Sequence, residues 1–224
     1  MLSRLLVVAC LVFGLVAPGF ARARPLVLML GDSTTFGTID VNFGQADVTT
    51  AEALQAMLRI AGRENRYRRA KVRNFGVPGA STRDWVVGPN PNLCAVWGPH
   101  LPFLAAACER QVPLVDVVPE NATAVLITLG YVDGVFGVPV EETVANVTAI
   151  AGRFAASRRV LVAPPFVPLA GNEFQAPRDV RRQALLNAGL VSGPDWPVFP
   201  LVDVVHLTPG GYAAAAGLWL DVLR

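Results

Sequence analysis

The chain has 224 residues, of which 53% are hydrophobic and only 16% are charged, and its formal net charge is +2. This length and apolar fraction suffice to bury the core of one domain. They exclude an intrinsically disordered chain, a miniprotein held together by disulfides alone and a collagen-like fibre.

The first 23 residues have the pattern of a secretory signal peptide. Arg4 gives a positively charged start, a nearly uncharged apolar run covers residues 5–20, and Ala21-Arg22-Ala23 matches a cleavage signal of small residues. About 20 apolar residues are needed to span a bilayer, and Pro18-Gly19 interrupts this run. We therefore expect cleavage after Ala23, and a secreted or periplasmic single domain over residues 24–224 with no integral membrane segment.

Removal of residues 1–23 leaves 17 of the 19 basic residues against 17 acidic ones, so the mature chain is formally neutral. A neutral chain has no electrostatic reason to bind nucleic acid or an anionic membrane. The one basic cluster, Arg66 to Arg73, is expected to be a solvated helix end and loop that leads into a strand. The oligomeric state is not predicted by any of these features.

Strand and helix patterns alternate through the rest of the chain. The expected elements are a strand at residues 25–30, a helix at 49–61, strands at 72–75 and 124–129, a helix at 140–156, a strand at 159–163, a helix at 178–188, a strand at 198–202 and a helix at 211–223. The alternation predicts an α/β fold whose parallel sheet has five strands and is covered by helices on both faces.

The stretch of residues 85–119 interrupts this alternation and is rich in proline, glycine and asparagine. Ligands of such sheets bind beyond the carboxyl ends of the strands, where this insertion is expected to form a wall or lid. It contains Cys94 and Cys108, which we expect to form a disulfide if the protein is exported. A bridge closing a loop of about 15 residues would stabilise the fold by about 3 kcal/mol. In a reducing compartment the two cysteines would remain thiols.

Several kinds of chemistry lack their usual motifs. His100 and His206 are far apart in the sequence, and neither H-E-x-x-H nor C-x-x-C occurs, so no metal site is expected. The P-loop, the G-x-G-x-x-G fingerprint and the G-x-S-x-G elbow are also missing from the sequence. The sequence therefore gives no support to a phosphate cradle or an α/β-hydrolase nucleophile elbow.

Polar residues follow the first and last predicted strands. Ser33 comes just after the first strand, near an expected helix N-terminus, where backbone N–H groups point at a developing oxyanion. Asp203 and His206 follow the last strand, and their i, i+3 spacing lets the carboxylate hold one ring nitrogen while the other faces a nucleophile. Taken alone, Ser33 or His206 could equally be a helix cap.

Four short blocks together resemble a known family. Gly31-Asp32-Ser33, residues 74–79 (Asn-Phe-Gly-Val-Pro-Gly), residues 130–133 (Gly-Tyr-Val-Asp) and Asp203-x-x-His206 resemble, in order, the four blocks of the SGNH hydrolases, also called GDSL esterases and lipases. The resemblance spans the mature chain. It implies a flavodoxin-like three-layer α/β/α fold and hydrolysis of carboxylic esters, either small acyl esters or acetyl groups on carbohydrate, without a cofactor.

The resemblance also assigns roles. Ser33 would be the nucleophile that forms an acyl-enzyme, His206 the general base and later acid, and Asp203 the residue that orients the imidazole. The backbone N–H groups of Ser33 and Gly79 would form part of the oxyanion hole. Asp32 is expected to bond to nearby backbone.

Val132 departs from the family pattern, which has an asparagine at this position that donates to the oxyanion. Loss of one such donor typically costs about 2.7–4 kcal/mol in the barrier. Asn74, Tyr131 and Thr34 are candidates for a substitute donor. The alternatives are therefore a slow esterase, a catalytically impaired ligand-binding protein with the same fold, or an acyltransferase that reuses Ser33 and His206.

The remaining polar and aromatic residues are expected to be mainly structural. Asp133 is expected to order the loop after the third strand, and His100 to lie in a loop, as the fallback base. Four aromatic residues are expected to pack in the fold, with an acyl or sugar pocket as the alternative place for them: Trp85, Trp97, Phe103 and Phe136.

Overall fold

The computed structural model describes residues 24–39 and 44–224. The predicted signal peptide, residues 1–23, lies outside the described residues. Within the described part of the chain, no helix combines the length and apolar character that a membrane crossing requires.

Four parallel strands form the central sheet. They are β1 (Leu26–Gly31), β2 (Lys71–Gly76), β3 (Ala124–Thr128) and β4 (Arg159–Ala163), arranged in the order β2-β1-β3-β4. The two central strands are buried along nearly their whole length, as expected for strands covered on both faces. Gly31 pairs with Gly76 on one side and with Thr128 on the other, so the carboxyl ends of three strands meet at one edge.

Helices connect the strands and cover the sheet. In chain order they are α1 (Ser33–Phe36), α2 (Thr50–Ile60), α3 (Thr82–Val86), α4 (Pro91–Trp97), α5 (Pro102–Arg110), the 3-10 helix η1 (Leu114–Val117), α6 (Tyr131–Val135), α7 (Val140–Arg153), α8 (Gln175–Asn187) and α9 (Pro209–Leu223). A capping box opens α2, at the start of the helix predicted for residues 49–61: Thr49 accepts from the Glu52 N–H, and the Glu52 carboxylate accepts from the Thr49 N–H.

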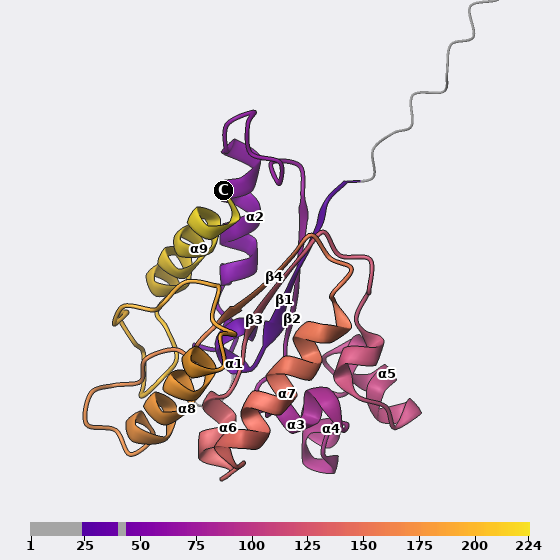
Figure 1. Ribbon diagram of the computed structural model, residues 1–224, viewed down its shortest axis with the longest axis vertical. Helices are drawn as coiled ribbons and strands as arrows, with labels where there is room; N and C mark the ends of the chain where they lie inside the picture. Colours follow the sequence, from indigo (N-terminus) through magenta and orange to yellow (C-terminus); the bar gives the residue numbers. More distant parts are fainter. Residues whose placement is uncertain (1–23, 40–43) are drawn as a thin grey trace, which may run out of the picture.

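The helices form a layer on each face of the sheet. Figure 1 shows α2 and α9 side by side on one face, and α7 together with α3, α4 and α5 on the other. Alternate side chains of β1 enter the two cores: Val27 and Met29 face α2 and α9, whereas Leu28 and Leu30 face α7 and the insertion. The predicted three-layer α/β/α class is therefore confirmed, with a strand order of the flavodoxin-like kind.

The prediction of a fifth strand at residues 198–202 is wrong for the part of the chain that the structure describes. Pro197 and Pro200 have no N–H to donate to a ladder, and Leu201 makes only an isolated antiparallel bridge with Leu207. The place beside β4 is taken instead by residues 191–193, where Val191 forms a single parallel bridge with Val162. The sheet therefore has four strands.

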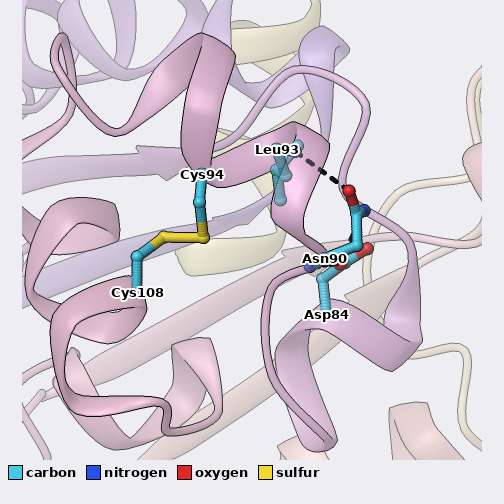
Figure 2. The surroundings of a disulfide bond; sticks show 5 residues. All are labelled: Asp84, Asn90, Leu93, Cys94 and Cys108. Carbon is cyan, nitrogen blue, oxygen red and sulfur yellow. Dashed lines mark hydrogen bonds between the residues drawn. A yellow bond between two sulfur atoms is a disulfide. The ribbon is translucent and has the colours of Figure 1, made fainter.

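The insertion folds into α4, α5 and η1, continuing from α3. The disulfide between Cys94 and Cys108 joins α4 to α5, with an S–S distance of 2.03 Å and a Cα–Cα distance of 5.9 Å (Figure 2). Beside it the Asn90 side chain caps α4 by accepting the Leu93 N–H at 2.9 Å, and Asp84 accepts from the backbone and side-chain N–H of Asn90. The insertion is thus a helical layer fixed by a disulfide and by caps.

Candidate active site

The end of β1 presents Ser33 at a helix N-terminus. A Cβ at Gly31 would lie against the Thr35 side chain and 2.6 Å from the Thr128 carbonyl oxygen, so only glycine fits where the chain leaves the strand. Asp32 caps α1, since its Oδ1 accepts the Thr34 N–H at 3.0 Å and the Thr34 hydroxyl at 2.7 Å. Ser33, the first residue of α1, is held in a fixed position and is 7% exposed.

The predicted triad residues are brought together. His206 Nε2 lies 3.0 Å from Ser33 Oγ, and His206 Nδ1 lies 2.7 Å from Asp203 Oδ2. The other carboxylate oxygen of Asp203 accepts the N–H groups of Val205 and His206 at 2.9 and 2.8 Å. These bonds fold residues 203–206 into a turn and aim the imidazole at the serine.

The surroundings of Asp203 keep it ionised. Burial opposes this, but hydrogen bonds from the N–H groups of Val205 and His206 and from the imidazole hold the pKa of Asp203 below its ordinary value. A carboxylate beside Nδ1 favours the tautomer with the proton on Nδ1, which leaves Nε2 to accept from the Ser33 hydroxyl. The arrangement therefore has the donors and acceptors that deprotonation of a serine requires.

Asp32 is a second buried carboxyl beside Ser33. Its burial raises its pKa to about 6, an effect that the hydrogen bonds from Thr34 and the nearby His206 partly offset. The prediction that Asp32 bonds to nearby backbone is confirmed by its contact with the Thr34 N–H.

The two backbone N–H groups predicted for the oxyanion site lie in segments that meet at the end of β1. Ser33 opens α1, and the first N–H groups of a helix have no partner within it. Gly79, at φ +79°, lies in the turn after β2, which the hydrogen bond from the Val77 N–H to the Gly31 carbonyl (3.1 Å) holds against the end of β1. Among the described residues, neither the Ser33 nor the Gly79 N–H has a hydrogen-bond partner.

Of the three candidate substitutes for the donor that Val132 lacks, two are already engaged. Val132 itself is buried in α6. The Asn74 amide donates to the carbonyls of Thr35 and Phe36 at 2.9 and 3.2 Å, and the Thr34 hydroxyl donates to Asp32. The Tyr131 hydroxyl is buried and lacks a partner in the described part of the chain.

Asp133 orders the segment after β3, as predicted. Its carboxylate accepts from the Thr82 hydroxyl at 2.6 Å and from the Thr82 N–H, and Asn146 donates to the same hydroxyl at 3.0 Å. The carboxyl is fully buried, which raises its pKa. These hydrogen bonds connect α6 to α3 and α7, so Asp133 has a structural role.

His100 lies on the exposed turn between α4 and α5, as a loop residue. Its ring packs against Trp97, with centroids 6.2 Å apart, and Trp97 in turn packs against Phe36 of α1 at 5.6 Å. The insertion therefore forms a wall beside the helix that carries Ser33.

Three other aromatic residues take structural or surface positions. Trp85 is completely buried in the core under the insertion. Phe103 packs edge-on against Phe75 with centroids 5.0 Å apart, and Phe136 is 63% exposed. Trp85 and Phe103 are therefore packing residues, as predicted.

Sequence reasoning missed two buried arginines on α8. Arg178 Nε donates to the Pro165 carbonyl at 2.9 Å, and Arg181 donates to the carbonyls of Asp133 and Val138. They hold the loops that follow β4 and β3. Charged residues in an amphipathic helix ordinarily predict a solvated face, so no signal in a single sequence marks these two as buried.

No group of three or more His, Cys, Asp or Glu side chains within residues 24–39 and 44–224 is arranged to hold a metal ion.

No family model matches the sequence, and no curated protein is significantly similar to it. Solved structures do match. An acetylxylan esterase from Geobacillus stearothermophilus, in a catalytic mutant, is 18% identical with a TM-score of 0.56, over 89% of this chain and 94% of that one. Est24, a carbohydrate acetylesterase from Sinorhizobium meliloti, is 15% identical with a TM-score of 0.55, over 88% and 97%. A member of the lipolytic G-D-S-L family from Veillonella parvula is 16% identical with a TM-score of 0.53, also over 88% and 97%. The chain therefore has the fold of the SGNH, or GDSL, hydrolases.

Proposed function

We propose that this protein is an exported serine esterase that hydrolyses carboxylic esters through an acyl-enzyme on Ser33. The observation that carries the proposal is the continuous contact from Ser33 Oγ through the His206 ring to the Asp203 carboxylate. A serine hydroxyl is a weak nucleophile at its free pKa, and an adjacent base that is oriented by a third group is what activates it.

In the first step, Ser33 Oγ attacks the ester carbonyl carbon while His206 Nε2 takes the hydroxyl proton. The carbonyl oxygen becomes an oxyanion, which the N–H groups of Ser33 and Gly79 stabilise. Collapse of this intermediate breaks the bond to the alcohol oxygen, which leaves with the proton from His206. Asp203 stabilises the imidazolium in between and remains a carboxylate.

In the second step, water attacks the acyl-enzyme with His206 as the base. The proton returns from Nε2 to Ser33 Oγ as the carboxylic acid leaves. No redox change and no substrate other than the ester and water are needed. If another hydroxyl compound takes the place of water, the same steps give acyl transfer.

The similar structures support a proposal for the substrate class. One is an acetylxylan esterase, of which serine-to-alanine and aspartate-to-alanine forms are described as catalytic mutants, and another is a carbohydrate acetylesterase. We propose small acyl esters, and acetyl groups on carbohydrate in particular, as substrates.

Val132 favours one further candidate function. Because valine cannot donate to the oxyanion, a protein that keeps the fold and binds an ester without useful turnover is the second function to test.

Turnover of p-nitrophenyl acetate and butyrate tests the proposal. We expect the purified mature protein to hydrolyse the acetate ester, and Ser33→Ala to abolish this. Ser157→Ala is the matched control, because Ser157 Oγ is another buried hydroxyl, located before β4, and no partner for it occurs among the described residues. A folded wild type without turnover would favour the binding protein, and equal rates in Ser33→Ala would exclude the serine mechanism.

A further inference from the structure

The oxyanion site described above has two backbone donors and a valine where a third, side-chain donor is expected. We propose that the Tyr131 hydroxyl is this third donor and is a catalytic residue that binds the carbonyl oxygen of the ester as Ser33 attacks. The inference rests on the proposed esterase function and adds a residue to its site.

Tyr131 lies at the same edge of the sheet as Ser33. It opens α6 after Gly130, whose φ of +107° turns the chain out of β3, just as Ser33 opens α1 after β1. The two strands are neighbours, with Gly31 paired to Thr128. Tyr131 is thus three residues beyond this pair, and Ser33 is two residues beyond it.

The tyrosine side chain is enclosed, but its hydroxyl is left unused. Tyr131 is 7% exposed, and its ring packs against Phe174 with centroids 6.2 Å apart. Its hydroxyl oxygen has no hydrogen-bond partner within the described residues. Buried polar groups are nearly always paired, so an unpaired one calls for an explanation, and a substrate oxygen would supply the missing acceptor.

The charge state of Tyr131 suits a donor. Burial raises the pKa of this phenol to about 12, and the nearby charges of Asp32, Asp203 and Glu173 add to the effect. The hydroxyl therefore keeps its proton at neutral pH.

The step involves no proton transfer at Tyr131. As Ser33 Oγ bonds to the carbonyl carbon, negative charge moves onto the carbonyl oxygen, and the hydrogen bond from the phenol strengthens because its acceptor becomes charged. The bond weakens again when the alcohol leaves. A hydrogen bond that is stronger in the transition state than in the ground state raises kcat and leaves KM nearly unchanged.

Tyr131→Phe tests the inference, because it removes the hydroxyl and keeps the ring against Phe174. We expect kcat for p-nitrophenyl acetate to fall about 10²-fold, with KM changed by less than about threefold and an unchanged melting temperature. Tyr67→Phe is the matched control: Tyr67 also has a buried hydroxyl without a partner in the ranges that the structure describes, but it lies in the core, in the segment between α2 and β2. We expect this control to turn over like the wild type.

A second variant separates catalysis from packing. Val132→Asn introduces a side-chain donor at the next position, so in the Tyr131→Phe background it should recover most of the lost kcat. Loss of kcat with a lowered melting temperature and no recovery would assign Tyr131 to packing and overturn the inference. So would a Tyr131→Phe kcat within twofold of an active wild type. A wild type that neither turns over nor reacts with a serine probe would overturn the proposed function, and this inference with it.

Discussion

Ser33 depends on two side chains that are far from it in sequence. His206 is 173 residues away, and its Nε2 lies at hydrogen-bond distance from Ser33 Oγ. Asp203 makes this possible because it fixes the turn that contains both Asp203 and His206. Asp203 uses one carboxylate oxygen for the backbone and the other for the imidazole. A single side chain thus positions the imidazole and favours the tautomer with the proton on Nδ1.

At the scale of single residues, Val132→Asn tests the donors of the oxyanion site. We expect kcat for p-nitrophenyl acetate to rise about 10-fold, which is less than the 10²–10³ that a lone donor gives because the Tyr131 hydroxyl already acts there. Val132→Ala is the control, since it shortens the side chain without adding a donor, and it should give no gain. Equal rates in the asparagine and alanine variants would contradict the account.

Asp32→Asn tests whether the raised pKa of the buried Asp32 carboxyl makes the free energy of unfolding depend on pH. The pKa of Asp32 is about 6 in the folded protein against 3.8 ordinarily, so the folded state holds this proton more tightly than the unfolded state. The free energy of unfolding should therefore fall as pH rises from 4 to 6, by up to about 3 kcal/mol from this group. Asparagine keeps the acceptor for Thr34 and removes the charge.

We expect urea titrations from pH 4 to 8 to show a smaller decline in the variant, and at pH 7 a free energy of unfolding at least equal to that of the wild type. A variant whose stability declines as steeply as that of the wild type would show that Asp32 is not the group responsible.

At the scale of elements, the insertion is the part whose helices need support from outside themselves. It covers one face of the sheet, and α4 and α5 are short helices of seven and nine residues. Helices of this length are marginal on their own, so caps and cross-links must hold them. The Cys94–Cys108 disulfide and the Asn90 cap supply this (Figure 2).

Replacing both cysteines by alanine should lower the free energy of unfolding by about 3 kcal/mol, because the unfolded chain regains the freedom of a loop of about 15 residues. Denaturant titration measures this. Wild type treated with dithiothreitol should behave like the double variant. A loss below about 1 kcal/mol would mean that caps and packing alone hold α4 and α5.

The elements of the sheet were largely predictable from the sequence, but the insertion and the last strand were not. Strands β1 and β3 are uninterrupted apolar runs ended by a turn signal, which is a strong local pattern. The run at residues 198–202 has the same apolar character, yet Pro197 before it and Pro200 within it keep it out of the ladder. The helices at residues 85–119 are too short to show a sustained helical pattern of apolar residues in the sequence. Which of their residues are buried depends on how they pack on the sheet.

The same contrast holds for the site. The contact of Ser33, His206 and Asp203 could be expected because the blocks that carry them occur in a family-like order, although only Ser33 directly follows a strand. Arg178 and Arg181 could not, because their burial comes from contacts with loops far away in sequence.

On the scale of the whole molecule, the candidate site lies at one end of the sheet. The edge strand β2 carries exposed basic side chains. Lys71 and Arg73 are exposed on this edge strand, and neither forms an ion pair among the described residues. Charged side chains on an edge strand discourage its pairing with another chain. The basic cluster thus lies at the surface, as the sequence predicts.

Export is a prediction about the whole chain. Expression of all 224 residues in a host with a secretory pathway should release a protein that begins at Arg24, because Ala21-Arg22-Ala23 is the expected cleavage signal. Its intact mass should be lower by two hydrogens than that of the reduced mature chain. Intact-mass spectrometry with N-terminal sequencing measures both. A cell-retained product that begins at Met1 and carries free thiols would contradict export.

The central claim is that Ser33 is an activated nucleophile. The most direct test is to label the purified mature protein with a fluorophosphonate, which bonds covalently to serines activated by a base, and to locate the adduct by peptide mass spectrometry. The account predicts one adduct per chain, on Ser33, that is lost in Ser33→Ala and in His206→Ala and kept in Ser157→Ala. A folded wild type that takes up no label, or takes it up at another residue, would contradict it.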